Sequence, residues 1–290
     1  MFTGSHVAIV TPFRKGKVDE RALGDLIEWQ IAMGTNGIVP CGTTGESATL
    51  SHEEHNRVIE LTVEVVRRRV PVMAGTGSNS TDEAISLTKH AKQAGADAAL
   101  LITPYYNKPT QEGLYRHYKA IAEAVDLPLV LYNIPGRTGV NMFPATIARL
   151  AVIETIVGVK EGSGVIQQAS DIVQTCGDRL AVLAGDDAMT LPMMAVGGKG
   201  VITVTANIAP TEMANMVKAF AAGNIEEARR IHFQLSPLFA ALFYETNPIP
   251  VKEALGMMGK IDPELRLPLC SMGKENRDKL MQVMKEGRFI

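Results

Sequence analysis

The sequence has few cysteines and no strong excess of charge of either sign. Its three cysteines, Cys41, Cys176 and Cys270, lie far apart and form no CxxC pair. This spacing excludes a disulfide framework and a zinc ribbon, and we interpret the cysteines as reduced thiols. The net charge of -2 and the pI near 6.3 provide no basic field that would release counterions from nucleic acid. Nucleic acid is therefore excluded as a predicted partner.

The beginning of the chain also lacks a long apolar run. MFTGSHVAIVTPFRKG has only a short apolar stretch before Arg14 and Lys15, with no basic segment ahead of it. A signal peptide begins with a basic segment, and a membrane helix needs about 20 apolar residues. We therefore predict a cytoplasmic protein without a targeting segment or a membrane span.

Short apolar runs rich in β-branched residues alternate with longer amphipathic stretches along the chain. Eight such runs are present: VAIVTPF from Val7, GIVPCG from Gly37, VPVMAGTG from Val70, DAALLITP from Asp97, LPLVLYNIP from Leu127, TIVGVKEG from Thr155, LAVLAGDD from Leu180 and GVITVTAN from Gly200. Near-continuous apolar strands separated by helices are typical of a parallel sheet covered by helices. Eight repeats predict an α/β protein with a closed (β/α)8 TIM barrel, and a doubly wound sheet is the weaker alternative.

Helix signals define the rest of the organisation. Ser51 with Glu54 and Ser80 with Glu83 match the S-x-x-E capping box, so we expect helices to begin there. The catalytic barrel is predicted to occupy residues 1–223. No flexible linker follows it, so residues 224–290 are predicted to form a C-terminal helical region packed on the barrel. Its helices are expected near residues 225–244, 250–258 and 274–286.

The segment TIVGVKEGSG places Lys160 at the end of an otherwise apolar strand. In a barrel of this class, the C-terminal ends of the strands form the catalytic mouth. An amine that is poorly hydrated has a lowered pKa, and the neutral amine can attack a carbonyl carbon to form a Schiff base. The alternative is that Lys160 reaches solvent, or pairs with Glu161 or with a substrate carboxylate.

Two other strand ends carry complementary groups. YNIPGRTG places Tyr132 one strand from Lys160 and Arg137 in the following loop, where a phenol can transfer protons and a guanidinium can bind a carboxylate. CGTTGES offers hydroxyl and backbone amide groups to an anion. Singly, these features are also compatible with a core tyrosine, a solvated arginine and a tight turn. Together they favour a catalytic site.

GTTGES, YNIPGRTG and GVKEGSG, in this order and spacing, resemble the dihydrodipicolinate synthase family, also called 4-hydroxy-tetrahydrodipicolinate synthase, of the pyruvate-dependent class I aldolases. The resemblance covers essentially the whole chain. It implies a (β/α)8 barrel with a C-terminal helical region and a homotetramer built as a dimer of dimers, with no cofactor or metal. The implied lyase reaction is a Schiff-base condensation of pyruvate with L-aspartate 4-semialdehyde, giving 4-hydroxy-tetrahydrodipicolinate for diaminopimelate and lysine biosynthesis.

The resemblance also implies roles for individual residues. Lys160 is the imine-forming residue and Tyr132 the proton donor and acceptor. Thr43 and Tyr106 match a proton relay, in which the tyrosine comes from a neighbouring subunit. The implied substrate contacts are Thr44 and the backbone of Ile202 for pyruvate, and Arg137 for the carboxylate of the aldehyde substrate.

SHEEH, residues 51–55, contains two histidines, but it is not an HExxH motif and has no further ligands, so we exclude zinc. The simplest interpretation is a helix start with solvated histidines. By the resemblance, however, a set of residues matches an allosteric lysine-binding site at the dimer interface: Ser47, Ala48, His52, His55, Asn79, Glu83 and Tyr105. We therefore hypothesise that L-lysine is an effector.

Two other functions are open. Another aldolase of the superfamily, an N-acetylneuraminate lyase or a 2-keto-3-deoxy sugar acid aldolase, would share the lysine and the tyrosine, but Arg137 argues against it. A noncatalytic lysine-binding barrel would retain the mouth residues as relics. The seventh strand ends in Asp186 and Asp187, at a place where barrels commonly bind phosphate, which favours an unphosphorylated substrate.

Overall fold

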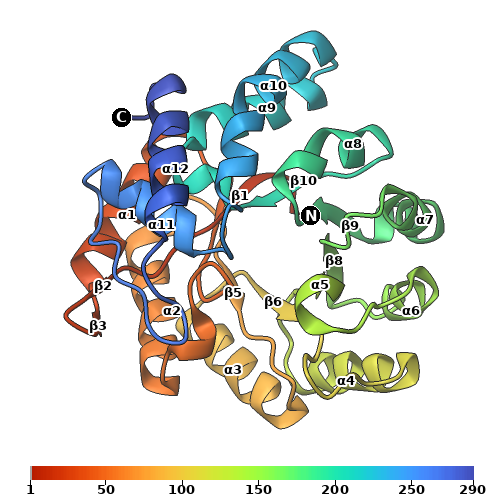
Figure 1. Cartoon of the computed structure of the whole chain (residues 1–290). Coiled ribbons are helices and arrows are strands. Elements are labelled where there is room, and N and C mark those ends of the chain that lie inside the picture. The colour runs from red at the N-terminus through yellow and green to blue at the C-terminus, as the bar shows by residue number, and fades with distance from the viewer. Residues whose placement is uncertain (1) are drawn as a thin grey trace. The chain divides into compact units, whose positions relative to one another are not determined.

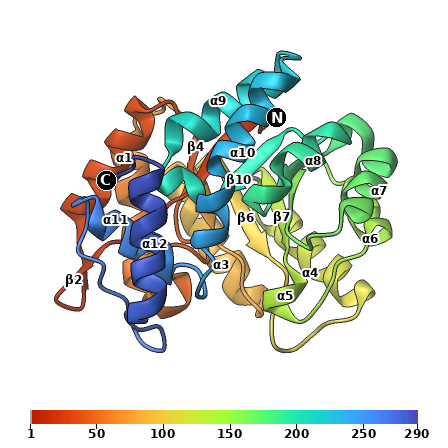
Figure 2. The same ribbon diagram turned by 45° about the horizontal axis from the view of Figure 1, so that its top comes forward.

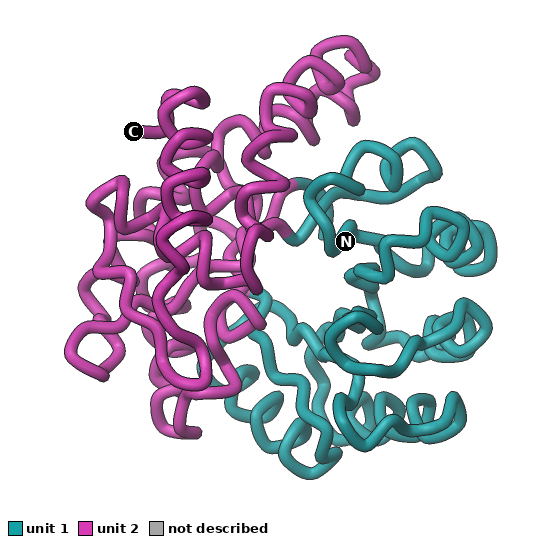
Figure 3. The backbone as a smooth tube through the Cα atoms, viewed as in Figure 1, with its two compact units in different colours: residues 1–4, 73–202 teal, residues 5–72, 203–290 magenta. Residues whose placement is uncertain are grey.

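The computed structural model describes residues 2–290 and contains two compact units (Figure 3). Unit 1 consists of the described residues up to Gly4 and of Met73–Ile202, and unit 2 consists of Ser5–Val72 and Thr203–Ile290. Unit 2 is thus built from two segments that are far apart in the sequence. The predicted division of the chain into a barrel and a helical region at residues 223 and 224 stays a prediction.

Eight strands form one sheet, and each lies where the sequence predicts a strand. They are β1 (Gly4–Ala8), β4 (Gly37–Val39), β5 (Met73–Gly75), β6 (Ala98–Ile102), β7 (Leu129–Asn133), β8 (Ile156–Glu161), β9 (Ala181–Ala184) and β10 (Gly200–Thr203). Their order in the sheet is β4-β1-β10-β9-β8-β7-β6-β5. A parallel bridge between Ile38 of β4 and Val72, just before β5, joins the two ends of this order. The fold is therefore a (β/α)8 barrel, which confirms the predicted class.

Helices follow the strands along the chain. In unit 1 these are α3 (Thr81–Ala94), α4 (Gln111–Ala124), α5 (Pro135–Thr138), α6 (Pro144–Leu150), α7 (Ile166–Cys176) and α8 (Thr190–Ala195). In Figure 1, strands β6, β8 and β9 lie inside helices α4, α6 and α7. The helices of unit 2 are α1 (Glu20–Ala32), α2 (His52–Val66), α9 (Pro210–Ala221), α10 (Ile225–Ala241), α11 (Ile249–Met257) and α12 (Lys274–Glu286). Within residues 2–290, every helix is too short or too polar to cross a bilayer.

Both predicted capping residues begin a helix. The Ser51 hydroxyl accepts a hydrogen bond from the Glu54 amide at 3.2 Å, and the Glu54 carboxylate accepts one from the Ser51 amide at 3.0 Å. This reciprocal pair is a complete capping box at the start of α2. At the start of α3, Ser80 accepts from the Glu83 amide at 3.5 Å, and the Glu83 carboxylate accepts a bond from the Ser78 hydroxyl.

The C-terminal helices agree with the sequence analysis, and their contacts lie within unit 2. The predicted helices near residues 225–244, 250–258 and 274–286 correspond to α10, α11 and α12. Helix α12 packs against α10 and α11 (Figure 2), and it buries Leu280 and Met284. The strands β2 (Phe13–Arg14) and β3 (Lys17–Val18), which form a short antiparallel pair, were not predicted. Two-residue strands are too short to show a hydrophobic period.

A buried ion pair fastens α11 to the loop that follows β4. Lys252 is fully buried, and its Nζ donates to Glu46 Oε1 at 2.5 Å and to the Glu264 carbonyl oxygen at 2.6 Å. The Arg266 amide donates to the second Glu46 oxygen at 3.2 Å. Burial lowers the pKa of Lys252, and the Glu46 carboxylate opposes that shift. The C-terminal region is therefore connected to the GTTGES loop by charge and hydrogen bonds in a dry environment.

Candidate active site

Lys160 and Tyr132 lie side by side near the C-terminal ends of adjacent strands. Parallel pairing of β7 with β8 aligns Tyr132 with Lys160, and β8 pairs with β9 so that Lys160 aligns with Leu183. Side chains of directly aligned residues in neighbouring parallel strands point to the same face of the sheet. The Lys160 Nζ lies 4.4 Å from the centroid of the Tyr132 ring, and both residues are buried. The structure thus brings the predicted amine and phenol together.

The next residue on each strand shows which face these side chains occupy. Glu161 and Asn133 are also aligned, and Asn133 Nδ2 donates to Glu161 Oε2 at 3.0 Å. Gln168 of helix α7 donates to the same carboxylate oxygen at 3.0 Å, and the Ser163 amide donates to the other oxygen at 2.7 Å. Glu161 therefore points to the face covered by α7. Because strand residues alternate, Lys160 points to the opposite face, into the barrel.

This geometry rules out two of the alternatives for Lys160. Glu161 is buried and held by an amide network on the other side of the strand, so it is not the ion-pair partner of Lys160. Lys160 also does not reach solvent, since only 5% of it is exposed. The charges that act on the buried amine are instead those of Asp187 and Arg137.

Two glycines allow the ends of β8 and β9 to approach closely. A Cβ atom on Gly185 would lie 2.9 Å from the Gly162 Cα and 3.0 Å from the Glu161 carbonyl oxygen. The Gly185 amide donates to that oxygen at 2.7 Å. A side chain at Gly185 would therefore separate these strand ends, directly after Lys160.

Burial lowers the pKa of Lys160 from 10.5 to about 8. Loss of hydration of the charged form is the largest cause, the negative charge of Asp187 opposes it, and the positive charge of Arg137 lowers the pKa further. At pH 7 roughly one amine in ten is neutral, against roughly one in 3000 at a pKa of 10.5. The site thus raises the concentration of the nucleophilic form by roughly 300-fold.

Asp187 is a site residue to which the sequence analysis gave no catalytic role. It begins the short helix η3 (Asp187–Met189) after β9, and only 2% of it is exposed. From the sequence, Asp187 was expected only to disfavour a phosphorylated substrate, through its negative charge at the end of the seventh strand. A carboxylate at the end of a strand beside a predicted catalytic strand was a signal that could have been used, since the strand ends converge at one rim of the barrel.

Arg137 is exposed, in the single-turn helix α5 that follows β7. Hydrogen bonds to neighbouring backbone groups hold this turn: the Thr138 hydroxyl hydrogen-bonds with the Ile134 and Val140 carbonyl oxygens at 3.1 and 3.0 Å. Arg137 therefore extends from a well-held turn while its charge reaches the Lys160 amine. Ile202, the predicted backbone contact, lies fully buried in β10.

Thr43 and Thr44 belong to unit 2, in the loop after β4. Thr44 is buried, and its Oγ1 accepts a hydrogen bond from Asn247 Nδ2 at 3.0 Å. The Thr43 carbonyl oxygen accepts a bond from the Glu46 amide at 3.1 Å, which helps to close the turn. Glu46 itself has left-handed backbone angles, with φ of 51° and ψ of 38°.

Tyr106 stands out from the rest of the predicted site because 89% of it is exposed. Its backbone is also unusual, with φ of 73°, a left-handed conformation that an aromatic residue rarely adopts. Within a single chain, Tyr106 is thus directed into solvent.

The dihydrodipicolinate synthetase family model matches residues 1–287. The chain belongs to this family. It is 61% identical over 290 residues to the 4-hydroxy-tetrahydrodipicolinate synthase of Thermodesulfovibrio yellowstonii, with all of both chains covered. It is also similar to the crystal structure of the chloride-inhibited dihydrodipicolinate synthase from Acinetobacter baumannii complexed with pyruvate, with a TM-score of 0.98, 50% identity and all of both chains covered.

A further dihydrodipicolinate synthase structure, from Cyanidioschyzon merolae with lysine bound, has a TM-score of 0.97 and 41% identity, and the match covers 100% of this chain and 99% of that one. Together, the comparisons confirm the family, the fold class and the synthase function that the sequence predicts. The roles of individual residues stay predictions.

The residues that match the lysine site of the dihydrodipicolinate synthase family form two groups in the structure. In unit 1, Asn79 Nδ2 donates to the Tyr105 carbonyl oxygen at 3.2 Å. Burial, and then the charge of Glu83, raise the pKa of the Tyr105 phenol, which places that carboxylate near the ring. In unit 2, Ser47 and Ala48 lie in the short helix η1 (Ser47–Thr49), and His52 and His55 lie in the first turn of α2.

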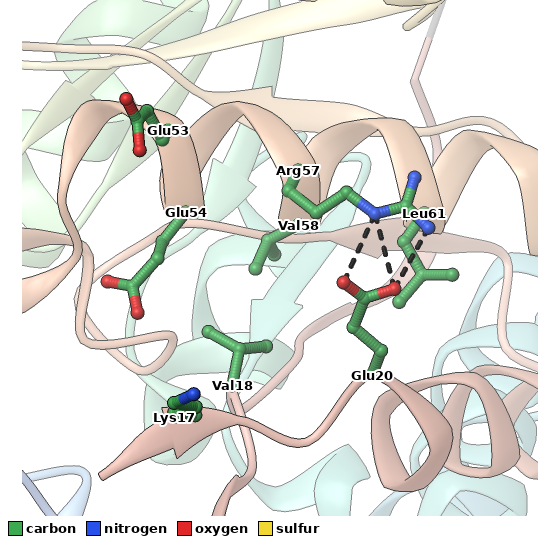
Figure 4. Close-up of a pocket in the computed structure, with 8 residues that line it drawn as sticks. All are labelled: Lys17, Val18, Glu20, Glu53, Glu54, Arg57, Val58 and Leu61. Atoms are coloured by element: carbon green, nitrogen blue, oxygen red, sulfur yellow. Dashed lines mark hydrogen bonds and ion pairs between the residues drawn. The ribbon is translucent and has the colours of Figure 1, made fainter.

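None of the predicted site residues lines the pocket of about 400 Å³ between β3 and α2 (Figure 4). It is lined by Lys17, Val18, Glu20, Glu53, Glu54, Arg57, Val58 and Leu61. Arg57 donates hydrogen bonds to Glu20 at 2.9 to 3.2 Å, so these two charged residues of the pocket form an ion pair with each other. Among residues 2–290, no group of three or more His, Cys, Asp or Glu side chains is arranged to hold a metal ion.

The two charges near Lys160 predict opposite shifts in the pH dependence of imine formation. Because only the neutral amine attacks, the initial rate of imine formation with pyruvate should rise with pH and level off above about 8. Asp187→Asn removes the charge that raises the pKa of Lys160, so its profile should move to lower pH. Arg137→Ala removes a charge that lowers the pKa, so its profile should move to higher pH. Rapid borohydride quenching across a pH series measures both, and shifts in the same direction would contradict the assignment.

Proposed function

We propose that the protein condenses pyruvate with L-aspartate 4-semialdehyde through a Schiff base on Lys160 and releases 4-hydroxy-tetrahydrodipicolinate. The observation that carries this proposal is the position of the Lys160 amine inside the barrel, where its pKa is lowered and its Nζ lies 4.4 Å from the centroid of the Tyr132 ring. The identity of 61% to a 4-hydroxy-tetrahydrodipicolinate synthase over the full length supports the choice of substrates. A family structure complexed with pyruvate supports the first substrate.

The reaction begins when neutral Lys160 attacks the ketone carbon of pyruvate. Proton transfer to the carbinolamine oxygen, with Tyr132 as donor, releases water and leaves an imine. Loss of a methyl proton then gives an enamine, because the protonated imine withdraws the electron pair. The enamine carbon attacks the aldehyde carbon of L-aspartate 4-semialdehyde, forming the new C–C bond. The amine of that substrate attacks the imine carbon, closes the ring and expels Lys160.

The remaining roles follow from the chemistry of the side chains. Thr44 and the backbone of Ile202 bind the pyruvate carboxylate, and Arg137 binds the carboxylate of the second substrate in bidentate geometry. Thr43 and Tyr106 relay protons to Tyr132. The exposure of Arg137 suits the binding of a substrate that enters after the imine has formed. No metal ion or organic cofactor takes part in this proposal.

Covalent trapping with pyruvate tests the proposal directly. Borohydride added with pyruvate should reduce the imine and leave a stable adduct on Lys160, detected by peptide mass spectrometry. Lys160→Met, which retains the length and apolar character of the side chain, serves as the matched control and should give no adduct. A wild-type protein that forms no adduct would favour the noncatalytic lysine-binding barrel.

Arg137 separates this function from the other aldolases of the superfamily. Arg137→Ala should still give the Lys160 adduct, while condensation with L-aspartate 4-semialdehyde falls by about 100-fold or more, because a charge-assisted bidentate contact is lost. Equal loss of both activities would contradict the assigned role. Cleavage of N-acetylneuraminate or of a 2-keto-3-deoxy sugar acid by the wild-type protein would favour the rival aldolases.

We further propose a homotetramer, a dimer of dimers in which Tyr106 enters the site of a neighbouring subunit. The exposure of Tyr106 and its left-handed backbone support this arrangement. Mixing Tyr106→Phe subunits with Lys160→Met subunits, followed by unfolding and reassembly, should regain activity that neither variant has alone. A mixed dimer would then contain one site with both native residues. Failure to regain activity, in mixtures shown to contain mixed dimers, would place Tyr106 in its own subunit.

L-Lysine is proposed as a feedback effector that binds at Ser47, Ala48, His52, His55, Asn79, Glu83 and Tyr105. A family structure with lysine bound and the cluster of Asn79, Glu83 and Tyr105 support this proposal. Excess L-lysine should lower the initial rate at subsaturating pyruvate, and Glu83→Gln should weaken that inhibition because the ligand amine loses a carboxylate partner. An unchanged wild-type rate would reject regulation by lysine. A cytoplasmic location is also proposed, in keeping with three free thiols.

A further inference from the structure

The C-terminal region contacts the GTTGES loop at two neighbouring points. Asn247, two residues before α11, donates to the Thr44 hydroxyl, and Lys252, within α11, donates to Glu46. Thr44 and Glu46 are separated by one residue, so both contacts act on the same turn of the loop. These contacts join parts of unit 2 that are about 200 residues apart in the sequence.

The hydrogen bond between Asn247 and Thr44 has a definite direction. Asn247 Nδ2 lies 3.0 Å from Thr44 Oγ1, and the exposed fractions of the two residues are 5% and 3%. A hydroxyl group has one hydrogen to donate and two lone pairs that accept. Because Thr44 accepts in this bond, its hydroxyl hydrogen is not used there and can be donated to another acceptor. A carboxylate offers only acceptors, so it matches a hydroxyl prepared in this way.

We propose that Asn247 is a positioning residue for substrate binding: its amide orients the Thr44 hydroxyl so that the hydroxyl donates its hydrogen to the carboxylate of pyruvate. This inference rests on the proposed function, in which Thr44 binds pyruvate. Asn247 itself acts only through Thr44.

The surrounding structure holds both partners in place. Glu46 accepts from Lys252 and from the Arg266 amide, so the loop backbone two residues after Thr44 is fixed in its left-handed turn. Arg266 also donates to the Thr49 carbonyl oxygen at 2.9 Å and to both oxygens of Glu54 at 2.6 Å. The loop is thus tied at Thr44, Glu46 and Thr49. A hydroxyl on a loop held at several points can be oriented by a single amide without losing its position.

A mutant cycle measured by pyruvate saturation of the Lys160 adduct tests this role. The pyruvate concentration that gives half-maximal borohydride-trapped adduct should rise about tenfold in Asn247→Ala, as expected for loss of one buried hydrogen bond that orients a donor. Thr44→Val removes the hydroxyl and should raise it by a similar or larger factor. In Thr44→Val, the further change Asn247→Ala should have no added effect, because the group through which Asn247 acts is already absent. If the double variant instead raised the half-saturating pyruvate concentration by the product of the two single-variant factors, the proposal would be overturned.

Asn247→Asp retains the shape of the side chain and reverses the hydrogen bond. The carboxylate can only accept, so it takes the Thr44 hydrogen and adds a negative charge near the pyruvate carboxylate. The pyruvate concentration that gives half-maximal adduct should therefore be higher in Asn247→Asp than in Asn247→Ala. A value equal to that of the wild-type protein would overturn the proposal. This variant also keeps the test valid if Asn247→Ala fails to fold.

Asn276→Ala is the matched control, since it removes an amide that donates to Glu245 at 3.0 Å in the same C-terminal region. It should leave pyruvate half-saturation unchanged, whereas an equal rise in Asn276→Ala would assign the effect to general loosening of the region and overturn the proposal. The proposed function has a separate readout. If the wild-type protein forms no adduct, the proposed function fails, whereas a wild-type adduct with unchanged saturation in Asn247→Ala and Asn247→Asp contradicts only the role of Asn247.

Discussion

The loss of hydration at Lys160 is the constraint on which the chemistry of this site depends. A charged amine is stabilised by water, and inside the barrel that stabilisation is absent, so the pKa falls to about 8. The two neighbouring charges have opposite effects: Asp187 raises the pKa of Lys160, and Arg137 lowers it. Burial is the largest cause of the lowered pKa, and the two charges change the fraction of the amine that is neutral.

The alternation of strand residues separates this site from the structural network directly behind it. Lys160 and Tyr132 face the interior, whereas Glu161 and Asn133 face helix α7 and form a network with Gln168. A second carboxylate on the inner face beside Lys160, in addition to Asp187, would further favour the ammonium form and reduce its reactivity. Placing Glu161 on the outer face satisfies its charge with amide donors instead. The same strand segment therefore supplies a reactive group and a rigid support without conflict.

Much of this arrangement could be predicted because it depends on short-range patterns. The apolar runs locate all eight strands and place Tyr132 one strand from Lys160, whereas their direct alignment depends on the register of β7 with β8. Ser51 and Glu54 form the predicted capping box because its geometry is local. Asn247 could not be assigned in this way, because its contact with Thr44 joins segments that are far apart in the sequence. The strands β2 and β3 could not be predicted either, because two residues in each strand are too few to show a hydrophobic period.

The contact between Glu46 and Lys252 shows why the C-terminal helices are an integral part of the fold. Without Lys252, the buried Glu46 carboxylate would lose the ammonium group that hydrogen-bonds to it and would keep only the Arg266 amide and the more distant charge of Arg266. Breaking such a buried pair costs about 3–5 kcal/mol, a large share of the roughly 5–15 kcal/mol that stabilises a typical domain. The same turn carries Thr43 and Thr44, so the penalty would fall on the loop that is proposed to hold pyruvate. Asn247 and Lys252 of the C-terminal region thus hold the turn that contains Thr44 and Glu46 through one set of contacts.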